Sequence, residues 1–232
     1  DGKGLSGLRS AEDEGEILHC PSILEKMVDI DVELAVMVAR NPSGEVVTYP
    51  VTEMEFDMRA NLLDLLLVPA RISDGLAEEA RALAARVVKA LDGVGVFGVE
   101  MFLDKSGTLL VNEVAPRPHN SGHYTLDACV TCQFEQHIRA ILGMPLGASH
   151  LWAPAAMINL IGEPGSRGPA RIAGLPEALA TPGASVHIYG KTECRPFRKM
   201  GHITVVDDRE NQALIKAKQL RDIVTFHGAN PE

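Results

Sequence analysis

Chemically active side chains are concentrated in twelve residues, Asn112 to His123, which hold carboxylate, guanidinium, amide, hydroxyl and imidazole groups. Pro116 and Pro118 lack a backbone N–H, and each disfavours helix at the residue before it. The stretch is therefore predicted to be a stiff, extended loop, delivered by the strand-like apolar run 108–111. Because loops on a rigid scaffold commonly carry binding and catalytic groups, this stretch is predicted to be an active-site loop.

A second strand-like run, 94–103, precedes this strand and is separated from it by the turn sequence 104–107. A two-residue hairpin loop would place Glu100 directly opposite Glu113, and a four-residue loop would make them diagonal neighbours on one face. A three-residue loop would put them on opposite faces. Like charges this close repel, so either one carboxyl group is protonated or a hard cation binds both. Oxygen ligands on a hairpin suit Mg²⁺, which completes its shell with phosphate oxygens and water.

Four basic residues fall within nine positions later in the chain: Lys191, Arg195, Arg198 and Lys199. Glu193 is the only acid among them, and Pro196 and Gly201 indicate a loop rather than a helix. Clustered arginine and lysine suit a phosphate group. Charge alone leaves a phosphate site and a solvated basic loop equally supported.

Periodicity and turn residues predict an α+β fold with mostly antiparallel strands. Strands are expected over 31–40, 45–51, 96–113 (as a hairpin), 155–161, 185–189 and 202–206. Helices are expected over 74–91, capped by Asp74, and over 126–142 and 211–223. Residues 145–154 are predicted to link two domains, 1–147 and 153–226.

The composition, with 232 residues of which 46% are hydrophobic and 23% charged, agrees with an intracellular enzyme without identifying it, and a cytoplasmic location is expected. No apolar run is long enough to span a membrane. The net charge of −9, without a basic stripe, disfavours nucleic-acid binding. Cys129 and Cys132 form a C-x-x-C pair, but Cys20 and Cys194 supply no second pair, so reduced thiols are expected rather than a zinc or redox site.

Five segments resemble the N5-carboxyaminoimidazole ribonucleotide synthases, a branch of the ATP-grasp ligases: 98–102, 111–123, 129–135, 180–191 and 195–202. The string from Arg117 to His123, Arg-Pro-His-Asn-Ser-Gly-His, separates this branch from other ATP-grasp ligases. The later segments are most similar to fungal-type members, in which this unit is fused to a carboxylase or mutase domain. The resemblance implies the C-terminal part of an ATP-grasp domain followed by a small β-rich domain.

The resemblance also implies a reaction in purine biosynthesis, in which ATP and bicarbonate carboxylate aminoimidazole ribonucleotide through carboxyphosphate. Mg²⁺ (or Mn²⁺) would be held by Glu100 and Glu113. ATP contacts are implied for Asp1, Gly2, Lys3, Gly4, Glu25, Lys26, Met27, Val28, Glu33, Asn112 and Glu113. Bicarbonate and its phosphorylated product would meet Arg117, His119, Asn120 and Lys191. The substrate phosphate would meet Lys191, Arg195, Arg198 and Lys199, and the full-length enzyme is expected to be a homodimer.

Two features depart from the family pattern. After Tyr49 and Pro50 the family often carries a histidine near the nucleotide, whereas residues 54–58 here are Met-Glu-Phe-Asp-Met. Residues 1–4 resemble the tail of a glycine-rich phosphate loop whose first residues would lie upstream, so a fragment with poor activity of its own is expected. The alternatives are another ATP-grasp ligase and a truncated, non-catalytic nucleotide-binding module.

Overall fold

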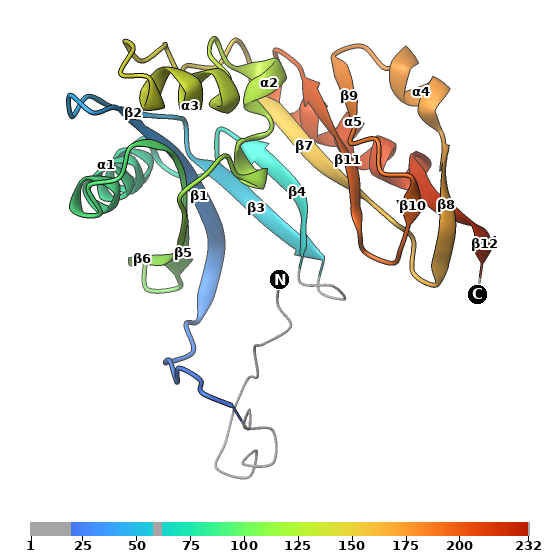
Figure 1. Cartoon of the computed structure of the whole chain (residues 1–232), viewed down its shortest axis with the longest axis horizontal. Coiled ribbons are helices and arrows are strands. Elements are labelled where there is room, and N and C mark those ends of the chain that lie inside the picture. The colour runs from blue at the N-terminus through green and yellow to red at the C-terminus, as the bar shows by residue number, and fades with distance from the viewer. Residues whose placement is uncertain (1–19, 58–61, 232) are drawn as a thin grey trace.

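The computed structural model describes residues 20–57 and 62–231 (Figure 1). The predicted phosphate-loop residues Asp1, Gly2, Lys3 and Gly4 lie outside the described residues. No helix in the described part of the chain is both long and apolar enough to cross a membrane. The α+β class predicted from the sequence is confirmed.

In the part of the chain that the structure describes, nine strands form one sheet in the order β6-β5-β1-β3-β4-β7-β11-β9, with β2 paired to β1. All ladders between these described strands are antiparallel. The strands are β1 (Ile30–Arg40), β2 (Val46–Thr48), β3 (Thr52–Asp57), β4 (Leu62–Val68), β5 (Gly95–Asp104), β6 (Leu109–Ala115), β7 (Ala155–Ile161), β9 (Ala184–Ile188) and β11 (Lys199–Val206). A smaller sheet has the order β10-β8-β12, from β8 (Ser166–Ala173), β10 (Glu193–Cys194) and β12 (Thr225–Pro231).

Helices and loops cover the two faces of the large sheet differently. Successive side chains of a strand point to opposite faces, and in β1 Val36 packs in the core under α1 (Asp74–Ala90) while Met37 packs with Tyr124 on the other face. In β4, Leu65 packs under α5 (Glu210–Ile223) and Leu66 joins the same core as Met37. Helices α1 and α5 therefore share one face, and the segment containing the predicted active-site loop covers the other.

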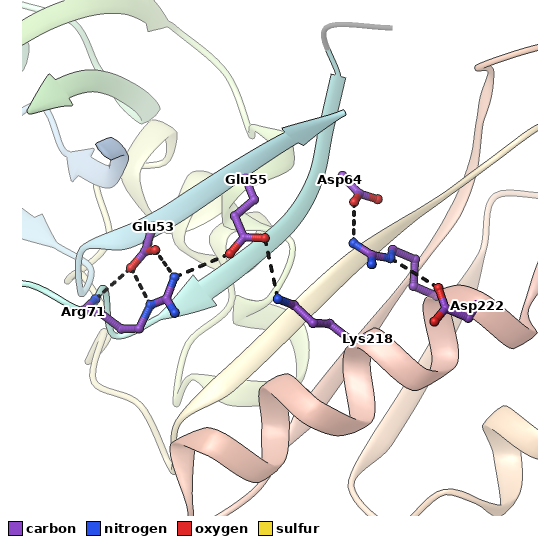
Figure 2. A network of polar contacts seen from close by, with 7 residues as sticks. Glu53, Glu55, Asp64, Arg71, Lys218 and Asp222 are labelled. Carbon is purple, nitrogen blue, oxygen red and sulfur yellow. Dashed lines mark hydrogen bonds and ion pairs between the residues drawn. The ribbon is translucent and has the colours of Figure 1, made fainter. Parts of the chain in front are cut away.

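The large sheet continues across the predicted domain boundary, because residues 65–68 of β4 pair with residues 155–158 of β7. A polar network also joins β3 and β4 to α5 (Figure 2). In it, Arg221 lies 2.8 Å from Asp64 and Lys218 lies 4.0 Å from Glu55. The division into domains 1–147 and 153–226 stays a prediction, but the two parts share one ladder of hydrogen bonds.

The predicted helix over 126–142 is wrong as a single element. The chain forms α2 (Thr125–Ala128) and α3 (Gln133–Ile141), and the residues between them pair with the predicted linker. The Val130 N–H donates to the His150 carbonyl and the Thr131 N–H to the Ala148 carbonyl, at 3.2 and 3.1 Å. Cys132 then caps α3 by accepting a hydrogen bond from the Glu135 N–H on its Sγ at 3.5 Å. Val130 and Thr131 are therefore not helical, because their N–H groups bond to the linker. The helical spacing of the apolar residues does not reveal these bonds.

Other predicted bounds need smaller corrections. Ser73, not Asp74, caps α1, since its Oγ accepts from the Leu76 N–H at 3.3 Å, and Asp74 lies in the first turn. The strand predicted over 45–51 is limited to β2. No prediction covered β3, β4, β8, β10, β12 or α4 (Leu175–Ala180).

Candidate active site on the β5–β6 hairpin

Glu100 of β5 and Glu113 of β6 are direct cross-strand partners, which is one of the two same-face arrangements predicted, although both predicted loop lengths are wrong. The Asp104 N–H donates to the Thr108 carbonyl at 3.0 Å, which leaves three residues in the turn. That length alone would put the two carboxylates on opposite faces. The register shifts beyond Met101, where Asn112 is the extra residue of a β-bulge, and the shift restores the pair.

The predicted active-site loop closes over these carboxylates. Gly98 allows the approach, because a Cβ there would lie 2.7 Å from the Cβ of His119. The Nε2 atom of His119 lies 3.6 Å from Oε1 of Glu100. The Ser121 N–H donates to Nδ1 of His119 at 3.4 Å, and Oγ of Ser121 lies 2.9 Å from the same nitrogen. This arrangement favours the imidazole proton on Nε2, which faces the carboxylate. Ligand atoms of Glu100, Glu113 and His119 all lie within 4.8 Å of one another.

Burial and charge shift the titration of this cluster. Burial, with the charges of Glu113 and Glu33, raises the pKa of Glu100 to about 7, against a lowering by Lys199. Burial, with the charges of Arg117 and Lys199, lowers the pKa of His119 to about 4. At neutral pH the imidazole is therefore uncharged, and Glu100 can take up either a proton or a cation. The hard oxygen donors of the two glutamates fit a divalent cation such as Mg²⁺.

The C-terminal part of the chain contributes Lys199, at the start of β11. Burial lowers the pKa of Lys199, and its ammonium group interacts with the charges of Glu100, Arg117 and Lys191. Lys191 donates a hydrogen bond to the Lys199 carbonyl and lies 5.6 Å from the centroid of the Tyr189 ring. The fold thus brings the predicted basic cluster to the active-site loop, with Lys199 rather than Lys191 interacting with Glu100.

The two arginines of the basic cluster are held by a neighbouring glutamate. Arg195 pairs with the Glu193 carboxylate at 3.0 Å, and the Arg198 guanidinium donates to the Glu193 carbonyl at 2.9 Å. Arg198 is near enough to lower the pKa of Lys191, after the larger effect of burial. These residues therefore border the site, and their binding of a substrate phosphate stays a prediction.

The side chains of three other predicted site residues differ in exposure and in their hydrogen bonds. The exposed Arg117 donates to the Pro118 carbonyl at 3.1 Å. Asn120 is half-buried, and its Nδ2 atom is buried without a hydrogen-bond partner among the described residues. Asn112 is exposed on the bulge. Of these, Asn120 is the one whose buried side-chain donor lacks a partner among the described residues.

The predicted nucleotide residues are only partly brought to the hairpin. Glu33 of β1 is near enough to Glu100 to raise its pKa, and burial raises the pKa of Glu33 itself. Glu25, Lys26, Met27 and Val28 lie in the segment that leads into β1 and extends away from the sheet (Figure 1). Met54, in the segment that departs from the family pattern, is the cross-strand partner of Glu33, whereas Met58 lies outside the described residues.

A second group of ligand-type side chains, Asp127, His187 and His202, lies between the two parts of the chain. The His187 Nε2 atom and the Asp127 Oδ2 atom are 2.9 Å apart. The rings of His187 and His202 are stacked, with centroids 4.5 Å apart and planes 14° from parallel. A metal ion must lie near the plane of each imidazole that binds it, which this stack does not allow. The group is a hydrogen-bonded contact between the C-terminal strands and α2.

Gln133, for which no role was predicted, lies under the active-site loop with its side chain fully buried. A signal was present in the composition of α3. This helix buries Gln133 and Gln136 against the protein and exposes Phe134 and Ile138, which reverses the usual distribution of polar and apolar residues. Buried glutamines on a short helix indicate specific hydrogen bonds rather than apolar packing.

Two family models match the chain: an ATP-grasp domain over residues 1–134 and a phosphoribosylaminoimidazole carboxylase C-terminal domain over residues 155–216. The chain is 43% identical over 215 residues to phosphoribosylaminoimidazole carboxylase of Saccharomyces cerevisiae, covering 89% of this chain and 37% of the relative. It is 44% identical over 216 residues to N5-carboxyaminoimidazole ribonucleotide synthase of Bacillus subtilis, covering 91% of this chain and 55% of the relative. The chain therefore spans about half the length of such relatives, or less.

Solved structures agree with these matches. N5-carboxyaminoimidazole ribonucleotide synthetase of Thermotoga maritima superposes with a TM-score of 0.88 at 51% identity, covering 95% of this chain and 59% of that chain. The synthase of Aspergillus clavatus in complex with ADP and 5-aminoimidazole ribonucleotide superposes with a TM-score of 0.77 at 38% identity, covering 85% of this chain and 52% of that chain.

Proposed function

We propose that this chain, which belongs to the ATP-grasp family, forms the metal- and bicarbonate-binding part of an N5-carboxyaminoimidazole ribonucleotide synthase. The reaction would join bicarbonate to 5-aminoimidazole ribonucleotide with cleavage of ATP to ADP and phosphate. The observation that carries this proposal is the cluster of Glu100, Glu113 and His119, which Lys199 approaches from the C-terminal part of the chain. Similarity to a synthase solved with ADP and aminoimidazole ribonucleotide supports the choice of substrates.

Glu100 and Glu113 would hold Mg²⁺ (or Mn²⁺), which neutralises charge on the ATP phosphates when it is bound. The raised pKa of Glu100 supports this, because a cation would relieve the repulsion between the paired carboxylates. Glu33 lies close enough to add to the same negative field. Asn112, Glu33 and residues 25–28 would contact the nucleotide.

Arg117, His119 and Asn120 would bind bicarbonate beside this pair, with Lys191 and Lys199 facing them. A bicarbonate oxygen would bond to the γ-phosphorus as the bond to the ADP oxygen breaks, which gives carboxyphosphate. The exocyclic amine would then attack the carboxyl carbon, directly or after release of CO₂, as phosphate leaves and the amine loses a proton. The neutral imidazole of His119 offers bicarbonate an N–H donor without adding a charge.

His119 and His123 are the two loop histidines that are candidates to take up the amine proton, but neither presents a free acceptor. Nδ1 of His119 accepts from the Ser121 N–H, and Nδ1 of His123 lies 2.8 Å from Nε2 of Gln133, which can only donate. In each neutral ring the remaining nitrogen carries the proton. Proton transfer through either histidine would therefore require one of these hydrogen bonds to break.

Arg195, Arg198 and Lys199 would hold the substrate phosphate at the mouth of the site. We also infer from the resemblance that the natural enzyme is a cytoplasmic homodimer that works with a fused or separate mutase or carboxylase domain. The small share of the yeast carboxylase that this chain covers is consistent with additional domains in such relatives.

The decisive experiment is an ADP-release assay on the natural protein that carries this chain. ADP release is expected to require both bicarbonate and aminoimidazole ribonucleotide, with one carboxylated product formed for each ADP. ADP release that is independent of aminoimidazole ribonucleotide, or that requires a different acceptor, would assign the chain to another ATP-grasp ligase. Binding of ATP without turnover would support the non-catalytic alternative.

A further inference from the structure

We propose that Gln133 is the positioning residue that fixes the active-site loop through the backbone of His119 and the ring of His123. This inference rests on the proposed function, because it concerns how the bicarbonate-binding groups are held. Gln133 contacts no reacting atom. It begins α3 directly beneath the loop, and its side chain is fully buried.

The carboxamide of Gln133 is used at three positions. Its Oε1 accepts a hydrogen bond from the His119 N–H at 2.8 Å, and its Nε2 donates to the His119 carbonyl at 2.9 Å. The same Nε2 lies 2.8 Å from Nδ1 of His123. Two donors and one acceptor in this arrangement match an amide and no other side chain of this length. The side chain therefore pairs with His119 as a neighbouring strand would.

This pairing supplies hydrogen bonds to a loop that has few backbone donors of its own. His119 follows Pro118, and neighbouring Pro116 also lacks an N–H, so the stretch offers few donors with which to fix itself. The two hydrogen bonds to Gln133 fix the His119 backbone relative to Gly98. They therefore also fix the distance between Nε2 of His119 and the Glu100 carboxylate. Arg117 and Asn120 flank His119 within two residues and take their position from it.

The third contact extends the same control to the C-terminal part of the chain. With Nδ1 of His123 accepting from Gln133, the ring presents its face to His202 of β11, with centroids 5.0 Å apart and planes 26° from parallel. Tyr189 lies edge-on to His123 at 6.2 Å and is bonded to His202 through its hydroxyl group at 2.9 Å. Gln133 thus also orients the His123 ring, which packs against His202 of β11, the strand that carries Lys199.

Gln133 is itself tightly held. Its N–H donates to Oγ1 of Thr125 at 2.9 Å, and that hydroxyl donates to the Gly122 carbonyl at 2.6 Å. A Cβ at Gly122 would lie 2.5 Å from Oε1 of Gln133 and 2.9 Å from Sδ of Met37. The space beside Gly122 is therefore filled by the Gln133 amide and Met37, and the backbone bond through Thr125 holds the start of α3 beneath the loop.

The same helix supplies a matched control. Gln136 is also fully buried and makes the same kind of paired contact, with the backbone N–H and carbonyl of Gly147 at 2.7 and 2.8 Å. Its partner lies in the segment joining the two parts of the chain, away from the loop. Gln136→Met and Gln133→Met each remove one such pair from the same helix, so their effects on folding should be comparable.

The test is steady-state kinetics of the natural protein and both variants, with ADP release and carboxylated product measured separately. Gln133→Met is expected to lower kcat for carboxylation by about a hundredfold, the effect of a displacement of about 1 Å in a reacting group. KM for ATP should stay within about threefold, and ADP release should exceed product formation because misplaced carboxyphosphate is hydrolysed. Gln136→Met should leave kcat and this ratio nearly unchanged.

A second measurement does not depend on activity. In protein labelled with ¹⁵N at histidine, the imidazole shifts of His123 should show a fixed Nε2–H tautomer in the natural protein and a mixture in Gln133→Met. If Gln133→Met does not fold, Thr125→Val removes the hydroxyl that holds Gln133 and should give an intermediate loss of kcat.

Equal effects of the two methionine variants on kcat, or an unchanged tautomer of His123 in Gln133→Met, would reduce Gln133 to a structural residue. Failure of the natural protein to carboxylate aminoimidazole ribonucleotide would instead overturn the proposed function, and the tautomer measurement would still report on Gln133.

Discussion

His119 lies 3.6 Å from Glu100, measured between Nε2 and Oε1, although the two residues come from a loop and a strand that face each other only because Gly98 has no side chain. At neutral pH an uncharged imidazole thus lies beside a carboxyl group whose raised pKa favours binding of a proton or a cation. This contact joins the hairpin proposed to bind the metal ion to the loop proposed to bind bicarbonate, so changes to the carboxylates test both assignments.

Glu113→Gln and Glu100→Gln should each lower Mg²⁺-dependent ADP release of the natural protein by about a hundredfold or more, because each removes a charged oxygen ligand. Far-ultraviolet circular dichroism should be unchanged, since Glu113 is exposed on the edge strand β6 and glutamine keeps the size and shape of the partly buried Glu100 side chain. Glu79→Gln, in the exposed part of α1, is the control and should retain full activity. Near-normal, bicarbonate-dependent ADP release by either site variant would show that the metal binds elsewhere.

Arg198→Ala should raise KM for aminoimidazole ribonucleotide by about tenfold to a hundredfold, the loss of one charge-assisted phosphate contact of about 1.5–3 kcal/mol. KM for ATP should change far less. Initial-rate measurements with each substrate varied in turn distinguish the two. Arg171→Ala, an exposed arginine on β8, provides the control. Similar changes in both KM values would move the basic cluster to the ATP side of the site.

The buried histidines should make the fold sensitive to acid. Burial, with the charges of His123 and His187, lowers the pKa of His202 to about 3, whereas an unfolded histidine titrates near pH 6.5. The unfolded chain therefore binds more protons between these values, and stability that is complete above about pH 6.5 is lost as the pH falls toward 3. From about pH 7 to about pH 5, His202 alone should account for up to about 2 kcal/mol of lost unfolding free energy.

Urea unfolding of the chain and of His202→Gln at both pH values measures this loss. The variant should lose less stability on acidification than the natural chain, whatever its stability at neutral pH. His227→Gln, which changes an exposed histidine on β12, should follow the natural chain. Parallel loss in all three proteins would mean that His202 is not the acid-sensitive group.

The ion pairs of Figure 2 should contribute little to stability on their own. Arg221 and Asp64 are 2.8 Å apart but both side chains are partly exposed, and such pairs typically contribute less than about 1 kcal/mol. A double-mutant cycle with Arg221→Ala and Asp64→Ala should give a coupling energy in that range, falling further in about 1 M salt. A larger, salt-resistant coupling would show that this network, and not the shared sheet, holds α5 in place.

The sequence allowed the carboxylate pair, the loop and the basic cluster to be identified because these residues are close together along the chain or follow strand periodicity. The face shared by Glu100 and Glu113 was predicted correctly for an incorrect reason. The alternation of side chains along the strands does not reveal a bulge. The three-residue turn moves Glu113 to the opposite face from Glu100, and the extra residue Asn112 moves it back.

The features that were missed depend on partners distant in sequence. Residues 129–132 are not helical because their backbone bonds to residues 148–150. Gln133 gains its role from a hydrogen bond with the His119 backbone, which only the folded chain brings to it. Similarly, charge spacing could not separate Lys191 from Lys199, because their order around Glu100 depends on where β11 joins the sheet. Local sequence patterns therefore indicated the types of chemical group at the site, whereas contacts between distant segments determined which lysine lies near Glu100.

The ladder between β4 and β7 has a mechanical consequence. Two units that share adjacent strands of one sheet cannot swing about a hinge without breaking several backbone hydrogen bonds at once. The distance between Lys199 and the carboxylate pair is therefore set by the stiffness of a pleated sheet. Movement that changes access to Glu100 and Glu113 is therefore expected in loops or in elements outside this sheet, while the two glutamates and Lys199 keep their positions relative to one another.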